Sequence, residues 1–179
     1  DNEGYMNTGV QRSSATPRTA RTATTPAVGP DPGNVFGTGK SLPRIAVAPG
    51  IPYVATATVA DLHDLERKVS KAMGIHGARY IQIHVPCPLG WGAASHDTIR
   101  LARLAVECGL FPVFEAEHGA VTNSRKIRRP VPVDDYLKPQ RRFAHLFKDA
   151  AGAKRLAHLQ AIADHNIVEY RMLEQEEDA

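Results

Sequence analysis

The chain has 179 residues, 42% of them hydrophobic and 23% charged, which is ordinary for a soluble protein with one hydrophobic core. It contains no apolar run near the roughly 20 residues of a membrane span, no leader and only two cysteines, so we expect a cytoplasmic protein in a reduced compartment, without membrane contact. The net charge of +3 comes mainly from residues 12–21 and 125–129, without interleaved aromatics, which favours solvated loops or subunit contacts over nucleic-acid binding.

The first nine residues form a polar turn rich in asparagine and glycine, with the sequence Asp-Asn-Glu-Gly-Tyr-Met-Asn-Thr-Gly. Side-chain amides and close-approaching backbone in one turn suit a hard cation and the phosphates that it carries. The alternative is a turn that only reverses the chain, and the spacing alone supports both interpretations equally. Because such a turn normally follows the carboxyl end of a strand, we expect the chain to be the C-terminal part of a longer protein.

Residues 16–50 are rich in threonine, proline, glycine and alanine, which predicts a long ordered loop around a site or a partner. The stretch 33–41 ends in Gly-Lys-Ser, like a phosphate-binding loop. That motif requires a glycine where Asn34 stands, and Pro43 is expected to interrupt a following helix. A nucleotide-binding loop is therefore disfavoured.

Strand and helix patterns then alternate along the chain. Strands are predicted at 51–57, 79–85 and 111–116, with helices at 61–73 and from Ser95 to a stop at Gly109. This order predicts an α/β fold with a parallel sheet, helices on both faces, and ligands outside the carboxyl ends of the strands. The opening turn and the loop 86–91 both lie at such ends.

The first of these helices has a predicted capping box from Thr58 to Asp61. Its apolar side chains share one face, which is expected to pack on the sheet, and its charged ones are expected to lie mostly toward solvent. The apolar residues are Leu62, Leu65, Val69 and Ala72, and the charged ones are Glu66, Arg67, Lys68 and Lys71.

Beyond Gly119 the polar stretch 125–130 is predicted to be a surface excursion, followed by a short helix from Val133. We expect residues 1–147 to form one domain that includes the 16–50 loop, and residues 148–179 to form a C-terminal helical tail. An apolar stripe predicts that this tail packs on the domain or on a partner subunit. The stripe consists of Leu156, Leu159, Ile162, Ala163 and Ile167.

Cys87 stands between two prolines in the loop 86–91, where a fixed backbone suits a metal–sulfur ligand. A free cysteine is more often a small buried hydrophobe, and one cysteine cannot hold a cluster, so composition favours that interpretation. Cys108 is expected in the core. His84 is expected to face either the polar side of the sheet or the Cys87 loop.

Other polar residues give weaker signals. His158 and His165 have no partners at zinc-site spacing, so packing or surface roles are expected. Glu115 and Glu117 share one face of a strand, and we expect surface positions rather than acid–base work for them.

Several motifs resemble the β subunits of pyruvate:ferredoxin oxidoreductases and related 2-oxoacid oxidoreductases. Asn-Glu-Gly-Tyr-Met-Asn-Thr-Gly-x-Gln-x-Ser-Ser-x-Thr-Pro, residues 2–17, is similar to the second half of their thiamine-diphosphate motif. Pro-Cys-Pro-x-Gly-Trp, residues 86–91, is similar to their cysteine loop. Further similar segments, in the same order, are 51–57, 104–109 with Phe114 and Glu115, and 133–137 with Gln140 and Phe143.

The resemblance implies the C-terminal part of a thiamine-diphosphate-binding fold of the pyrophosphate-binding type. It implies that the Asn2 side chain and the Gly4 carbonyl bind Mg²⁺, and that Tyr5, Met6 and Asn7 lie at the cofactor. Asn7 is the implied catalytic residue, next to the substrate carboxyl group. Cys87 is implied to give the fourth thiolate of a [4Fe-4S] cluster. The family's Gly-Asp-Gly ligand triplet does not occur in this sequence, and no residue matches its activating glutamate, so the chain carries half a site.

The activity implied is oxidative decarboxylation of a 2-oxoacid, pyruvate foremost, to acyl-CoA and CO₂. Electrons would pass through the cluster to ferredoxin, and coenzyme A and subunits of the alpha, gamma and delta types would be partners. One alternative is the same chemistry on a branched-chain, aryl or 2-oxoglutarate substrate. The other is a non-catalytic binding or assembly module whose basic loops dock an acidic partner.

Overall fold

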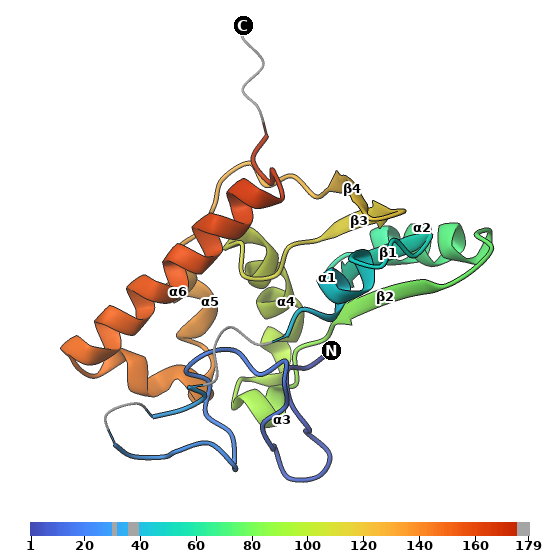
Figure 1. Ribbon diagram of the computed structural model, residues 1–179. Coiled ribbons are helices and arrows are strands. Elements are labelled where there is room, and N and C mark those ends of the chain that lie inside the picture. Colours follow the sequence, from blue (N-terminus) through green and yellow to red (C-terminus); the bar gives the residue numbers. More distant parts are fainter. Residues whose placement is uncertain (30–31, 36–39, 175–179) are drawn as a thin grey trace, which may run out of the picture.

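A four-stranded sheet lies in the part of the chain that the computed structural model describes, residues 1–29, 32–35 and 40–174 (Figure 1). The order of the strands across the sheet is β2-β1-β3-β4. Their bounds are Tyr53–Thr58 for β1, Arg79–His84 for β2, Phe114–Glu117 for β3 and Ala120–Ser124 for β4.

The first two strands form the predicted parallel pair. Tyr53 lies opposite Arg79 at one end, and Thr58 lies opposite His84 at the other. Helix α2 (Leu62–Met73) connects them, as the sequence pattern predicts. The carboxyl ends of β1 and β2 therefore meet at one edge of the sheet, where the loop after β2 begins.

The N-cap of α2 differs from the predicted box. Asp61 caps the helix, because its carboxylate accepts the backbone N–H of Asp64 at 3.0 Å. Thr58 is buried at the end of β1, and its hydroxyl accepts the N–H of Ala60 at 3.3 Å. A single acidic residue thus caps the helix, and its negative charge also interacts favourably with the positive end of the helix dipole.

The third strand corrects the prediction of a parallel sheet, which is in fact mixed. β3 runs antiparallel to β1, with Ala55 opposite Glu115. It continues into β4 through His118 and Gly119, whose φ angles are 49° and 89°. Two successive positive φ angles match the tight turns that join antiparallel strands. Hydrophobic alternation marks a strand but carries no information about its direction, and β4 has no counterpart among the predicted elements.

The face of α2 that meets the sheet also corrects the prediction. Leu62 and Val69 are 67% and 41% exposed, whereas Lys68 is 2% exposed. The Lys68 ammonium group donates to the carbonyl of Thr56 on β1 at 2.8 Å. Ala72 faces the sheet as predicted. Lys68 also pairs with the Asp64 carboxylate at 2.6 Å. The helix therefore turns part of its cationic face toward the sheet, where Arg67 and Lys71 pair with Glu115.

Glu115 is buried, which corrects the expectation of a surface position. Its carboxylate accepts hydrogen bonds from Tyr53 at 2.8 Å and Lys71 at 2.9 Å, and forms an ion pair with Arg67 at 2.8 Å. Burial raises the pKa of this carboxyl group, but the hydrogen bonds from Arg67, Lys71 and Tyr53 outweigh burial and lower the pKa to about 2. Glu115 is therefore charged at neutral pH and attracts the cations of α2.

A short helix interrupts the predicted 16–50 loop. Helix α1 (Leu42–Val47) begins at Ser41, whose hydroxyl caps it, and Pro43 lies in its first turn. The expectation that Pro43 interrupts a helix is wrong, because proline needs no hydrogen-bond partner in the first turn. Asn34 is buried and donates to the Thr16 carbonyl at 2.7 Å. Residues 36–39 of the disfavoured phosphate loop lie outside the described residues.

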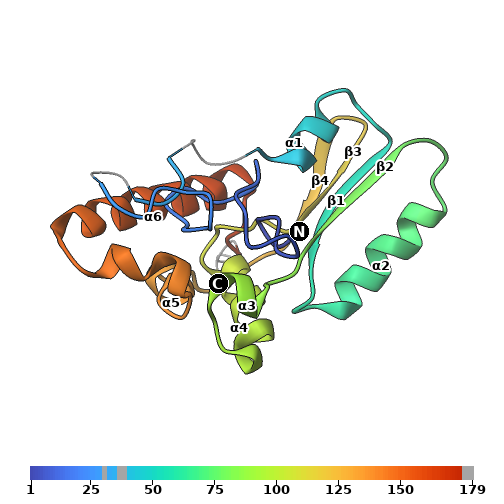
Figure 2. The same cartoon turned by 90° about the horizontal axis from the view of Figure 1, so that it is seen from below.

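Helices cover both faces of the sheet, as predicted, and the α/β class is confirmed (Figure 2). The α2 side carries Tyr53, Ala55 and Ala72 in one small core. The other face packs against α1, the end of α4 and the end of α6. The remaining helices are α3 (Pro88–Trp91), η1 (Ser95–Asp97), α4 (Thr98–Glu107), α5 (Val133–Leu137), η2 (Arg141–Phe147) and α6 (Ala150–Glu169).

Helix α4 ends where the sequence predicts. Gly109 follows it with φ of 83°, and a Cβ there would lie 2.8 Å from the Ala163 carbonyl on α6. Glycine is therefore required both by the backbone and by the close approach of α6. Ser95 is not the predicted cap of α4, because it begins the separate 3-10 turn η1.

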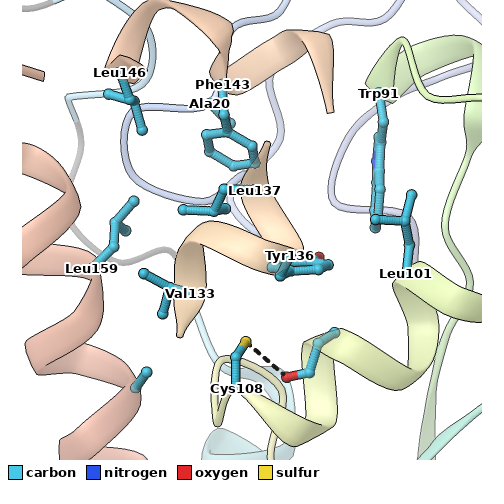
Figure 3. Packing of buried hydrophobic residues seen from close by; sticks show 12 residues of the cluster. Ala20, Trp91, Leu101, Cys108, Val133, Tyr136, Leu137, Phe143, Leu146 and Leu159 are labelled. Carbon is cyan, nitrogen blue, oxygen red and sulfur yellow. Dashed lines mark hydrogen bonds between the residues drawn. The ribbon is translucent and has the colours of Figure 1, made fainter. Parts of the chain in front are cut away.

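The largest core lies between α4, α5, η2 and α6 (Figure 3). Cys108 belongs to it, as predicted, and burial raises the pKa of its thiol to about 12. Tyr136 and Trp91 meet edge to face in this core, with ring centroids 6.4 Å apart. Most of the predicted stripe of α6 faces this cluster, so α6 packs on the same core as the preceding helices. Among the described residues, no helix is long and apolar enough to cross a membrane.

The two glutamates of β3 provide a test of the buried network in which Glu115 binds Tyr53, Arg67 and Lys71. We expect Glu115→Ala to lower the free energy of unfolding by about 2 kcal/mol, because it leaves the buried Tyr53 hydroxyl without its acceptor. Glu117→Ala is the matched control, since Glu117 shares Lys71 but is 37% exposed, and its cost is expected below about 1 kcal/mol. Urea denaturation of both variants measures the difference. Equal costs would contradict a buried network centred on Glu115.

Candidate functional site

The opening motif folds into a small closed turn. Tyr5 and Gln11 exchange backbone hydrogen bonds of 2.9 and 3.0 Å, and the residues between them reverse the chain. Gly9 and Val10 have φ angles of 110° and 60°. Asn7 is exposed on this turn. The sequence thus places a side-chain amide on a turn whose base is fixed by its own backbone.

The turn is joined to the carboxyl end of β2. The Asp1 N–H donates to the Ile83 carbonyl, and the Val85 N–H donates to the Asp1 carbonyl at 2.8 Å. This is the bonding pattern of parallel neighbours. The Gln82 side chain also donates to the Asp1 carboxylate at 2.6 Å. The motif therefore begins beside the loop that carries Cys87, as expected for sites at the carboxyl ends of strands.

The loop after β2 contains one turn of helix, α3, where the sequence predicts only a loop. Cys87 is its N-cap, and the sulfur of Cys87 accepts the N–H of Gly90 at 3.4 Å. Gly92 ends the turn with φ of 63°. Cys87 is half-buried, whereas the neighbouring Leu89 is 90% exposed. The two prolines and this turn fix the cysteine backbone at the molecular surface.

The motif turn and the Cys87 loop touch each other. The indole N–H of Trp91 donates to the Asn2 carbonyl at 2.9 Å. A Cβ at Gly90 would lie 2.1 Å from the sulfur of Met6, so a larger residue there would displace Met6. Figure 1 shows the blue N-terminal segment beside α3. Segments more than 80 residues apart in sequence are thereby packed together.

A buried ion pair lies behind this contact. Arg142 of η2 donates to the carboxylate of Glu3 at 2.6 Å, and the side chains are 3% and 16% exposed. The guanidinium lies 3.8 Å from the ring centroid of Trp91. Neither charged residue is among the predicted site residues. Their only sequence signal is position, since Glu3 lies inside the opening motif and Arg142 between the motif residues Gln140 and Phe143.

His84 lies on the side of the Cys87 loop, one of its two predicted orientations. It is fully buried, stacked on Phe111 at 4.6 Å between ring centroids, and 5.6 Å from Trp91. Burial and the nearby Arg142 charge lower its pKa to about 3, so the ring is neutral at neutral pH. Its Nε2 is 3.9 Å from the Glu3 carboxylate. Arg142 therefore supplies the positive charge that Glu3 pairs with.

Several oxygens of the motif are available for a ligand. Within residues 1–29, 32–35 and 40–174, no hydrogen bond engages the side-chain amides of Asn2 and Asn7 or the carbonyl of Gly4. Neutral amide and carbonyl oxygens are hard donors of the kind that Mg²⁺ accepts. No group of three or more histidine, cysteine or acidic residues in the described part could hold a metal by itself. These donors fit part of a magnesium shell, and other residues would have to supply the remaining ligands.

The sulfur of Cys87 likewise fits one ligand position of an iron–sulfur cluster. An N–H group that points at the sulfur is a known means of tuning such clusters. Tyr5, also on the motif, is 60% exposed and lies on the accessible side of the turn. The arrangement thus places hard oxygen donors on the motif turn beside a loop that carries a half-buried thiol.

Comparisons with known proteins identify relatives over most of the chain. No family model matches the chain. It is 48% identical over 172 residues to the pyruvate synthase subunit PorB of Methanosarcina barkeri, covering 96% of this chain and 58% of the relative. The PorB subunit of Methanocaldococcus jannaschii is 47% identical over 146 residues, which are 82% of this chain and 49% of that subunit.

A related subunit with another named substrate also matches. The ketoisovalerate oxidoreductase subunit VorB of Pyrococcus abyssi is 44% identical over 151 residues, covering 83% of this chain and 48% of the relative. The chain spans about half the length of the curated relatives it matches. These matches confirm the resemblance drawn from the motifs, and the chain belongs to the family of 2-oxoacid oxidoreductase β subunits that includes pyruvate synthase subunit PorB.

Proposed function

We propose that the chain is part of the β subunit of a thiamine-diphosphate-dependent 2-oxoacid:ferredoxin oxidoreductase that acts on pyruvate. The observation that carries this proposal is the contact between the motif turn and the Cys87 loop, through Trp91 and Asn2 and through Gly90 and Met6. A cofactor turn and a cluster ligand must lie close together if electrons are to pass from substrate to cluster. The names of the relatives support the same activity.

The motif turn is proposed to hold the diphosphate of the cofactor through Mg²⁺. The Asn2 amide oxygen and the Gly4 carbonyl would be two of about six oxygen ligands. Both are free of hydrogen bonds to described residues, and they flank one residue, so a single turn presents both. When bound, thiamine diphosphate supplies the electron sink that decarboxylation of a 2-oxoacid requires. Tyr5 and Met6 belong to the same turn and would line the cofactor.

Asn7 is proposed to bind the substrate. Its exposed side chain makes no hydrogen bond to the described residues, so its amide can donate to a carboxylate and hold it in place. Orientation of a substrate against a reactive group can contribute several kcal/mol, of the order of 7–11, to lowering the barrier. Asn7 therefore acts by position and by neutral hydrogen bonding, without a proton to give up.

Cys87 is proposed to bind one iron of a [4Fe-4S] cluster as a thiolate, with the other three ligands outside this chain. The overall reaction would convert pyruvate and coenzyme A to acetyl-CoA and CO₂, releasing two electrons and one proton. The electrons would leave singly through the cluster toward ferredoxin. Subunits of the alpha, gamma and delta types would complete the site and the electron path.

A branched-chain 2-oxoacid is the second candidate substrate. The observation that favours it is the 44% identity to a ketoisovalerate oxidoreductase subunit, close to the 48% found for a pyruvate synthase subunit. Viologen-dye reduction by the assembled complex with pyruvate, 2-oxoisovalerate, an aryl 2-oxoacid and 2-oxoglutarate would rank the substrates. Pyruvate is expected to give the highest kcat/KM. Absence of iron and sulfide from the complex would instead indicate a non-catalytic docking module.

Replacement of Asn7 tests its assignment. We expect Asn7→Ala to lower pyruvate-dependent viologen reduction by roughly 100-fold, the order found when a positioned hydrogen-bond donor is removed. Thr8→Ala is the control, because Thr8 is exposed on the same turn but donates to Gln11. It should retain near-normal activity, and size-exclusion chromatography should show both complexes assembled. Full activity of Asn7→Ala would remove Asn7 from the site.

Replacement of the two cysteines tests the cluster ligand. Cys87→Ala is expected to lower the iron content of the purified complex and to remove or alter one cluster signal in its electron paramagnetic resonance spectrum. Cys108→Ala is the control, because Cys108 is buried in the core with its thiol pKa raised to about 12. Its iron content should match that of the unmodified complex. An unchanged iron content and spectrum in Cys87→Ala would contradict the assignment.

A further inference from the structure

We propose that Arg142 is a positioning residue that holds the motif turn and the Cys87 loop at a fixed separation. This inference rests on the proposed function. It assigns to one buried side chain the alignment of the motif turn with the Cys87 loop, which are the two halves of the proposed site. Arg142 contacts one residue of each half, Glu3 in the turn and Trp91 in the loop. Arg142 is not itself one of the proposed ligands of Mg²⁺ or of the cluster.

The guanidinium group is itself held in one orientation. Its Nε donates to the Gln140 side-chain oxygen at 2.9 Å, and the Gln140 amide nitrogen donates to the Tyr136 carbonyl at 2.6 Å. The Phe143 ring lies 4.8 Å from the guanidinium carbon. The backbone carbonyl of Arg142 also accepts the N–H of Arg21 at 3.0 Å. A planar cation with these neighbours has little freedom to move.

The turn depends on this cation through Glu3. Asn2 and Gly4, the two proposed magnesium ligands, are the neighbours of Glu3 on either side. Glu3 has φ of 63°, a left-handed conformation that is unfavourable for a residue with a side chain. The ion pair with Arg142 and a 2.7 Å hydrogen bond from the Thr16 hydroxyl to the Glu3 carbonyl maintain it. The direction of both ligands therefore follows from where Arg142 holds Glu3.

The cysteine loop depends on the same cation through Trp91. The indole ring lies against the guanidinium at 3.8 Å and donates its N–H to the Asn2 carbonyl. The backbone N–H of Trp91 in turn donates to the Cys87 carbonyl at 2.9 Å. Displacement of Arg142 would thus shift Cys87 and Asn2 together. Displacements of about 1 Å far from the reacting atoms can cost roughly 100-fold in rate, so this support matters to the proposed reaction.

The test uses the assembled complex and measures cofactor binding, not activity alone. Arg142→Lys keeps the charge but loses the planar fork and the ring contact. We expect it to weaken the binding of thiamine diphosphate in the presence of Mg²⁺ by about 10-fold, the order found for groups that orient metal ligands. Calorimetric titration of the cofactor-depleted complex measures the dissociation constant. The cluster spectrum should shift while the iron content stays constant.

Lys68→Met is the matched control for lost stability. Lys68 is 2% exposed and belongs to α2. This helix lies on the other side of the sheet from the N-terminal segment and α3 (Figure 2). The variant should lower the unfolding temperature but leave the dissociation constant of thiamine diphosphate unchanged. A weakening as large in Lys68→Met as in Arg142→Lys would show that general destabilisation is the cause, and would overturn the proposal.

Glu3→Gln provides a second variant that keeps the shape of the side chain. It should weaken binding by a similar factor, and the double variant with Arg142→Lys should be no weaker than the worse single variant, because both act through one contact. Multiplying effects would overturn the proposal. If Arg142→Lys does not assemble, Glu3→Gln decides, and its failure to alter cofactor binding or the cluster spectrum overturns the proposal.

Cofactor binding by the unmodified complex distinguishes a failure of the proposed function from a failure of the positioning role. If this complex binds no thiamine diphosphate, the proposed function fails and the positioning role fails with it. If it binds the cofactor but Arg142→Lys and Glu3→Gln bind it equally well, with unchanged cluster spectra, only the positioning role is overturned.

Discussion

The buried ion pair between Glu3 and Arg142 is the interaction on which the candidate site depends. Two charges taken out of water are stable only when their geometry and hydrogen bonds are nearly complete. Arg142 meets this requirement through Glu3, Gln140 and the face of Trp91. His84 does not share the task, because burial keeps it neutral. The irregular first residues thus have a fixed place although they contain little regular secondary structure.

Part of the order of helices and strands could be predicted, because local sequence patterns mark the longer elements, whereas α1, α3 and β4 were missed. Periodicity marks β1, α2, β2 and α4, and Gly109 marks the end of α4 through a positive φ that favours glycine. The direction of β3 could not be predicted in this way. Alternation is the same for a parallel and an antiparallel strand. The hairpin from β3 to β4 was hidden as well, because its turn includes His118, which adopts a positive φ without being glycine.

The orientation of α2 shows where periodicity misleads. An apolar stripe on a helix predicts the buried face only if the surface opposite it is apolar. Here the buried carboxylate of Glu115 lies in that surface and pairs with Arg67 and Lys71 of α2, whereas Leu62 is left exposed. The pair of Glu3 and Arg142 could not be predicted either, because residues 139 positions apart leave no local signal. The motif residues Asn2, Gly4 and Cys87 could be recognised from the sequence, because they lie in short segments that resemble a family pattern.

The site divides into a rigid inner layer and an accessible outer one. Behind the turn and the loop lie Arg142, His84 and Trp91, all buried and in contact with one another or with Glu3. In front lie Asn7, Tyr5 and Leu89, all exposed. A site that must align a cofactor with an electron acceptor needs the first layer, because alignment tolerates little movement. It needs the second because the remaining ligands of the proposed metal and cluster sites would have to approach from outside. The side-chain amides of Asn2 and Asn7, the Gly4 carbonyl and the Cys87 thiol are the groups of this chain beside which such ligands would bind.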